Sequence, residues 1–147
     1  MKYLDQNIRF WIEQGYISCR PHPSLGLHIL NYTPPAQFDR QWNAATMQCR
    51  GLIVDDSGKV VSRPFRKFFN LSEHEQFAGH NYMDPVPVGA PFLAYEKMDG
   101  SLGISYPTPD GLAIATRGSF ASEQALKGTE LLRGKYAHVL PTLDPDL

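Results

Sequence analysis

The apolar residues near the start of the chain recur at the spacing of an α-helix. They fall on one helical face, at Leu4, Ile8, Trp11 and Ile12. Gly15 follows where a C-terminal glycine cap belongs. The pattern therefore predicts an amphipathic helix over residues 2–14.

Strand patterns follow this helix. The run "LGLHILNY", residues 25–32, predicts a strand that the Pro34-Pro35 pair stops, before a short segment around Trp42 for which a helix is one interpretation. From Arg50 onward, "GLIVDDSGKVVSRPF" has two apolar runs separated by Asp-Asp-Ser-Gly. Because these four residues favour tight turns, the stretch predicts a β-hairpin.

Further strands are predicted in the second half of the chain. "PFLAYEK", residues 91–97, has the pattern of a strand, and apolar residues alternate with small ones over residues 102–106. "PTPDG" then turns the chain into residues 112–116, with Leu112 and Ile114 on one face. We expect an antiparallel meander with Lys97 at its first bend.

A second helix is predicted near the C-terminus, in "SFASEQALKGTELLRGKY". Ser119 or Ser122 offers an N-cap, and Glu123 falls in the first turn. The last stretch, "LPTLDPDL", contains several residues that break strands and helices. The pattern as a whole predicts an α+β fold, mainly an antiparallel sheet with flanking helices.

Composition narrows this picture only slightly. A chain of 147 residues with 42% hydrophobic residues can bury the core of one domain, and its net charge of −1 gives no overall attraction to nucleic acid. Cys19 and Cys49 form no C-x-x-C pair, and the lone C-x-x-H spacing of Cys19 and His22 has no second pair to complete a zinc site. Charges in residues 1–15 exclude a signal peptide, so we expect a cytoplasmic protein with no membrane segment.

Lys97 is the candidate for chemistry. It precedes Met98-Asp99-Gly100, and Gly100 permits positive φ or a close approach of the backbone to a ligand. A lysine is a nucleophile only as the neutral amine, which its reference pKa of about 10.4 makes rare at neutral pH. Neighbouring cations would lower that pKa, and the candidates are Arg50, Arg63, Arg66, Lys67 and Arg117.

Each of these features also has a plainer interpretation. A lysine before an Asp-Gly turn is most often solvated, and the cations can equally form a solvated face. Phe68 and Phe69 offer an aromatic face for a purine, but one of two adjacent strand residues should be buried in any case. Glu96 can simply pair with a nearby cation.

The stretches "CRGLIVDDSGKVVSRPFRKFFNLSE", "YEKMDGSLGISY" and "TRGSFASEQAL" occur in this order and spacing. Together they resemble one family, the ATP-dependent RNA ligases of the phage tRNA-repair type (RNA ligase 1). Lys97 to Ser101 matches the nucleophile motif of all covalent nucleotidyltransferases, including DNA ligases and mRNA capping enzymes. The combination of Arg50-Gly51 with Ser62-Arg63-Pro64 and Lys67-Phe68-Phe69-Asn70 is more specific to the RNA ligase branch. The resemblance covers residues 40–132 and implies the N-terminal part of a nucleotidyltransferase (ATP-grasp-like ligase) domain.

The resemblance implies an activity. Lys97 would attack the α-phosphate of ATP, release pyrophosphate and hold AMP as a phosphoramidate. AMP would then pass to the 5′-phosphate of RNA, and a 3′-hydroxyl would displace it to seal the strand. Mg²⁺ would neutralise the triphosphate charge. The substrates and cofactors implied are thus RNA ends, ATP and Mg²⁺, in RNA repair.

The resemblance also implies roles for residues around the nucleotide. Arg50 would contact the ribose or the phosphates, and Lys67 the γ-phosphate. Phe69 would stack on adenine, while the backbone of Glu96 would approach the adenine edge. Arg117 stands where the family more often has lysine; arginine still holds phosphate, but it cannot carry a proton.

The chain departs from the family after its last helix. The family's later carboxylate, glutamate-glycine and paired-lysine motifs are not found before Leu147. We therefore expect residues 1–147 to be the N-terminal portion of an adenylation domain, whether as a fragment, a shortened product or one piece of a split enzyme. An open sheet edge would then favour self-association.

Two alternatives stay open. The chain can be a catalytically silent nucleotide- or RNA-binding module, because the basic residues and the Phe-Phe pair serve that function equally well. A DNA ligase or a capping enzyme is a third interpretation, but the Lys67-Phe68-Phe69-Asn70 segment does not resemble theirs.

Overall fold

The computed structural model of the chain describes residues 5–76, 89 and 91–142. Helices and strands mix along the sequence, so the α+β prediction is confirmed. In chain order the elements are α1 (Gln6–Glu13), β1 (Ile17–Pro21), β2 (Leu27–Tyr32), α2 (Pro34–Phe38), α3 (Ala44–Gln48), β3 (Arg50–Asp55), β4 (Val60–Ser62), α4 (Leu71–Gln76), β5 (Ile104–Thr108), β6 (Gly111–Ala115), α5 (Glu123–Arg133) and the 3₁₀-helix η1 (Ala137–Thr142).

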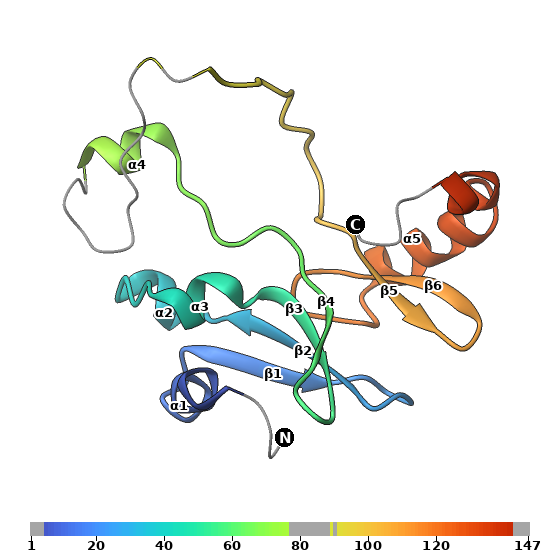
Figure 1. Cartoon of the computed structure of the whole chain (residues 1–147), viewed down its shortest axis with the longest axis horizontal. Helices are drawn as coiled ribbons and strands as arrows, with labels where there is room; N and C mark the ends of the chain where they lie inside the picture. The colour runs from blue at the N-terminus through green and yellow to red at the C-terminus, as the bar shows by residue number, and fades with distance from the viewer. Residues whose placement is uncertain (1–4, 77–88, 90, 143–147) are drawn as a thin grey trace.

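The strands of the described residues form two antiparallel sheets (Figure 1). One sheet has four strands in the order β1-β2-β3-β4, and the other is the β5–β6 hairpin. The predicted hairpin after Arg50 is confirmed as β3–β4, and its turn is fixed by Asp55, whose carboxylate accepts from the Ser57 and Lys59 amides at 2.8 and 3.0 Å. Strand β1 was not predicted, because its short run of mixed residues has no clear alternation.

The helices begin and end largely where local chemistry indicates. Asp5 caps α1 by accepting from the Asn7 amide at 2.8 Å, and Gly15 follows with φ of 79°. Ser122, not Ser119, caps α5. The Pro34-Pro35 pair opens α2 rather than only stopping β2, as proline at the first helical positions allows. In the part of the chain described, no helix is long and apolar enough to cross a membrane.

The two middle strands of the four-stranded sheet are buried on both faces. Alternate residues of β2 and β3 point to opposite sides, so that Leu30 and Leu52 face α1 and α3 while Ile29 and Ile53 face the β5–β6 hairpin. Helix α5 then covers the outer side of the hairpin, where Thr129 Oγ1 accepts from the Ile114 amide at 2.9 Å. The result is a layered arrangement in which β3 lies at the centre.

The predicted strand over residues 91–97 is wrong. Residues 91–100 contain no strand and are all exposed, including Phe92 at 85% and Tyr95 at 82%. Figure 1 shows this stretch as an irregular trace that runs apart from both sheets. An alternating pattern becomes a strand only beside a partner edge, and none of the described strands pairs with it. Lys97 therefore does not lie at the bend of a meander.

Gly51 is a point of close approach between β3 and the turn after β6. This residue has φ of +89°, and a Cβ built on it would meet Ile104 Cδ1 and lie 3.2 Å from Arg117 Cα and 3.3 Å from Arg117 O. A side chain there would be strained by the backbone and would also push the turn after β6 away from β3. Only glycine allows this contact.

We expect Gly51→Ala to destabilise the fold by about 2–4 kcal/mol, from left-handed strain plus overpacking. Gly111→Ala is the matched control, because Gly111 has φ of +100° but no atom within 4 Å of the position that a Cβ would take. That control should cost only about 1–2 kcal/mol. Urea unfolding of the two variants measures the difference, and equal losses would contradict the close-approach argument.

Candidate functional site

A cavity of about 420 Å³ opens where the two sheets meet. The end of β2, the start of β3, the residues before β5 and the turn after β6 form its walls. Its lining contains two arginines and no acidic side chain, and consists of Asn31, Arg50, Gly100, Ser101, Leu102, Thr116, Arg117 and Gly118. Such a cavity is suited to an anion.

Arg117 is held in place by an aromatic side chain of β2. Its Nη1 donates to the Tyr32 hydroxyl at 3.0 Å, and its guanidinium carbon lies 5.1 Å from the centre of the Tyr32 ring. Tyr32 itself is buried, with 6% exposure. The turn that carries Arg117 is closed by the Thr116 amide, which donates to the Ser119 carbonyl at 2.9 Å. Arg117 is therefore positioned before any ligand arrives.

Arg50 begins β3 and reaches toward the segment that follows β4. Its Nη1 donates to the Phe65 carbonyl at 3.4 Å, and its guanidinium carbon lies 5.1 Å from the centre of the Phe68 ring. The preceding residue, Cys49, is fully buried, and burial raises the pKa of its thiol to about 12. Arg50 thus projects from a well-packed strand start.

Lys67 lies close to the same charges. Its amide donates to the Met47 carbonyl at 2.8 Å, which fastens this stretch to α3, and its Nζ donates to the Phe68 carbonyl at 2.7 Å. Burial lowers the pKa of Lys67; Glu73 opposes this shift, and the charges of Arg50 and Arg117 add to it. Burial, with a smaller contribution from the two arginines, thus lowers the pKa of Lys67, whereas the sequence analysis expected the cations to act on Lys97.

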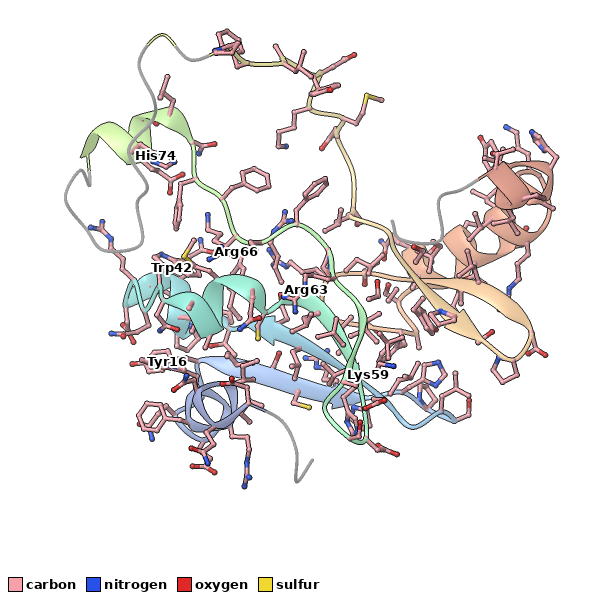
Figure 2. All side chains as sticks on the ribbon, viewed as in Figure 1. Tyr16, Trp42, Lys59, Arg63, Arg66 and His74 are labelled. Carbon is pink, nitrogen blue, oxygen red and sulfur yellow. The ribbon has the colours of Figure 1, made fainter. Side chains whose placement is uncertain are left out.

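Edge-to-face aromatic contacts support Lys67. Ring centres lie 5.0 Å apart for Tyr32 and Trp42, 5.6 Å for Trp42 and Phe69, and 6.1 Å for Phe69 and His74. The Lys67 ammonium lies 4.0 Å from the centre of the Phe69 ring and 5.5 Å from that of Trp42. We call these four aromatic residues the aromatic shelf. Figure 2 shows Trp42 and His74 on the same side of the molecule, well separated from Lys59.

Sequence reasoning missed the roles of Tyr32 and Trp42. Tyr32 was predicted only as the last residue of a strand and Trp42 only as part of a short segment, because nothing in a linear pattern shows that Arg117 and Lys67 reach them. Phe68 and Phe69 do not lie on a strand; Phe68 is exposed, whereas Phe69 is half-buried on the shelf. Their predicted alternation across a sheet is therefore wrong.

The other predicted residues divide into two groups. Arg50, Gly100 and Arg117 line the cavity, and Gly100 has φ of 130°. Glu96 and Lys97 are exposed in the irregular stretch and do not line it, and among the described residues Glu96 makes no ion pair.

Two further candidate features lie outside the cavity. Arg63 is exposed and donates to Gln48 Oε1 at 3.2 Å, and Arg66 is exposed as well. Among the described residues, no group of three or more His, Cys, Asp or Glu side chains is placed to hold a metal ion. Cys19 and His22 therefore belong to no such group.

We expect Arg117→Gln to weaken the binding of inorganic tripolyphosphate by about tenfold or more, because a charge-assisted hydrogen bond is lost. Lys59→Gln is the control, since it removes the same charge from the distant, exposed β3–β4 turn. Isothermal titration calorimetry at fixed ionic strength measures both. Equal affinities in the two variants would mean that the cavity does not bind the anion.

Comparison of the sequence with known proteins identifies the family of the chain. The model of a family described as RNA ligase matches residues 48–141. A protein of Thermovibrio ammonificans that carries the name of an RNA ligase is 34% identical over 103 residues, which are 69% of this chain and 25% of that protein.

A second relative comes from Autographa californica nuclear polyhedrosis virus and is named as a bifunctional polynucleotide kinase/RNA ligase. It is 36% identical over 103 residues, 66% of this chain and 14% of its own length. The chain thus spans a quarter or less of the length of these relatives. Because the family model covers most of its sequence, the chain belongs to the RNA ligase family of enzymes, of the phage RNA ligase 1 type.

Proposed function

We propose that this chain forms the nucleotide-binding part of an ATP-dependent RNA ligase in which Lys97 accepts AMP. One observation carries the proposal: Arg50 and Arg117 meet at a cavity without acidic side chains, and their charges also act on Lys67. A triphosphate supplies the negative charge that this arrangement lacks. Membership of the RNA ligase family supports the choice of RNA as the strand to be joined.

The proposed reaction treats ATP as a substrate. The Lys97 ammonium first gives one proton to solvent. Its Nζ lone pair attacks the α-phosphorus, a P–N bond forms, the P–O bond to pyrophosphate breaks, and the nitrogen gives a second proton to solvent. An oxygen of the RNA 5′-phosphate then attacks the same phosphorus, the P–N bond breaks, and lysine leaves with a proton taken from solvent. Finally the RNA 3′-hydroxyl gives its proton to solvent and attacks the activated 5′-phosphate, the P–O bond to AMP breaks, AMP leaves, and the strand is sealed.

The proposed binding roles follow the geometry. Arg50 and Arg117 hold the phosphates from two walls of the cavity, and Gly100 lets the backbone come close to them. Lys67 does not line the cavity, but it lies near enough for the charges of Arg50 and Arg117 to act on it, and its proposed role is to contact the γ-phosphate. In the structure its ammonium covers one face of Phe69, so Phe69 can stack on adenine through that face only after Lys67 turns toward the phosphates.

The fit of Mg²⁺ to this chain is a separate question. The cavity lining has no carboxylate, and the described residues offer no metal-binding cluster. The described part of the chain therefore does not provide a magnesium site of its own. When bound to the triphosphate, Mg²⁺ would offset phosphate charge.

Lys97 is close enough in sequence to serve the cavity. It precedes Gly100 by three residues, a stretch that spans at most about 10 Å when fully extended. A rotation of this exposed stretch can therefore bring the amine toward the phosphates while Gly100 stays in the wall. Pairing of residues 91–97 with another strand would fix that position, and a second copy of the chain is one proposed partner.

A silent nucleotide- or RNA-binding module is the second candidate. The exposure of Lys97 favours it for the chain by itself, because nothing in the described structure directs the amine at the cavity. The two functions differ in one observable, which is a covalent bond to AMP. They share the prediction that ATP binds at the two arginines.

We expect the chain to bind ATP but to become labelled by [α-³²P]ATP and Mg²⁺ only weakly. Lys97→Ala should leave ATP affinity within about twofold of the parent, since Lys97 does not line the cavity, and should remove the residual label. Arg50→Gln should weaken ATP binding about tenfold. Label of equal intensity in Lys97→Ala would contradict the assignment of the nucleophile, and efficient label in the parent would contradict the expected weak activity.

The position of Lys67 predicts that its replacement affects the binding of ATP and of adenosine differently. Lys67→Ala should lower ATP affinity about tenfold, because a phosphate contact is lost. It should not lower adenosine affinity, because the substitution uncovers the face of Phe69 that the Lys67 ammonium occupies. Lys127→Ala is the control, since it removes an exposed lysine of α5. Equilibrium titration with the two ligands measures both effects; a parallel loss of adenosine and ATP binding would show that Lys67 only maintains the fold.

A further inference from the structure

A second cavity of about 370 Å³ lies beyond the turn that carries Arg117. The β1–β2 connection, the β5–β6 hairpin, the segment before α5 and one side of α5 enclose it. Its lining is mixed: Leu25, Ala113 and Leu126 are among the apolar residues, and the charged residues Asp110 and Arg133 line it as well. Neither the comparisons nor the resemblance assigns it a function.

The cavity is lined by a cluster of three aromatic rings. Ring centres lie 4.7 Å apart for His22 and Phe120, 5.1 Å for Tyr106 and Phe120, and 5.8 Å for His22 and Tyr106. Tyr106 and Phe120 are buried in the core between the sheets. Such a surface favours a flat, weakly polar ring as a ligand.

The hydrogen bonds of His22 determine whether the Tyr106 hydroxyl accepts from His22 or donates to it. His22 Nδ1 accepts from the Ser24 and Leu25 amides, each at 3.1 Å, so the ring proton of the neutral imidazole is on Nε2. Burial lowers the pKa of His22, which favours this neutral form. Nε2 lies 3.2 Å from the Tyr106 hydroxyl and therefore donates to it.

Tyr106 is left with one unused donor. Its oxygen accepts from His22, and no described residue accepts the hydroxyl proton. Burial raises the pKa of Tyr106, so the hydroxyl stays protonated at neutral pH. The cavity thus presents the Tyr106 hydroxyl as a donor without an acceptor among the described residues, next to the polar lining residues Ser24, Thr108, Asp110, Thr129 and Arg133.

Hydrogen bonds hold the elements around the cavity together. Arg133 Nε donates to the Leu112 carbonyl at 2.8 Å and Nη2 donates to Thr108 Oγ1 at 2.9 Å, which ties α5 to the hairpin. The two cavities also share one turn, because Thr116, Arg117 and Gly118 line the first and Phe120 and Ala121 line the second. A ligand in the second cavity therefore lies next to the segment that positions Arg117.

We infer that the second cavity binds one unstacked base of the RNA strand, whose carbonyl oxygen accepts a hydrogen bond from Tyr106. The inference rests on the proposed function, since that function supplies RNA. Proteins that bind single-stranded RNA commonly hold splayed bases against aromatic side chains and contact their polar edges. Uracil, cytosine and guanine have a carbonyl oxygen, whereas adenine has none, so this site and the adenosine site prefer different bases.

The test titrates the chain with uridine and adenosine and follows amide shifts by NMR. We expect uridine to perturb Leu25 and Ala121 and to bind more tightly than adenosine at these residues. Tyr106→Phe should weaken uridine about fivefold to tenfold and remove the preference for uridine over adenosine, because one hydrogen bond is lost. Tyr136→Phe, at an exposed tyrosine beyond α5, is the control.

The outcomes separate this inference from the proposed function. The inference is overturned if folded Tyr106→Phe binds uridine as tightly as the parent, or if the uridine shifts do not map to Leu25 and Ala121. Neither result would affect the tripolyphosphate binding that depends on Arg117. Loss of tripolyphosphate binding in the parent chain would instead count against the proposed function. Tyr106→Phe should leave tripolyphosphate affinity unchanged, since Tyr106 does not line the first cavity.

Discussion

The close approach of the Arg117 turn to the backbone of Gly51 is the contact on which the site depends. Gly51 lies directly after Arg50, so the same contact that joins the two sheets also brings the two guanidinium groups to one cavity. The burial of β3 on both faces keeps this strand in place. Charge placement here is thus a consequence of packing rather than of surface chemistry.

Three cations gathered at one place repel one another, and the surrounding groups offset this repulsion. Arg117 is bound by the Tyr32 hydroxyl, Arg50 by the Phe65 carbonyl and Lys67 by the Phe68 carbonyl. Aromatic faces next to each of the three add a further favourable contact. A polyanion entering such a site finds its partners already oriented, which lowers the entropic cost of binding.

The sequence was informative where structure is local. Helix α5 and the β3–β4 hairpin follow from a cap residue, a turn and regular spacing, all contained in a few neighbouring residues. The strand predicted over residues 91–97 is wrong because a strand needs the edge of a partner strand, and a local sequence pattern does not show whether that edge is present. Resemblance pointed to Arg50 and Arg117, but Tyr32 and Trp42 became visible only when distant segments were folded together.

Cys49 has a consequence for the chemistry that the site tolerates. It immediately precedes Arg50, is fully buried, and has a thiol pKa of about 12, so almost none of it is thiolate at neutral pH. Peroxides and alkylating agents attack thiolates, and they would also need a path into the core. The start of β3 is therefore protected from oxidation at this thiol, so the strand register that places Arg50 at the cavity does not depend on the redox state of the surroundings.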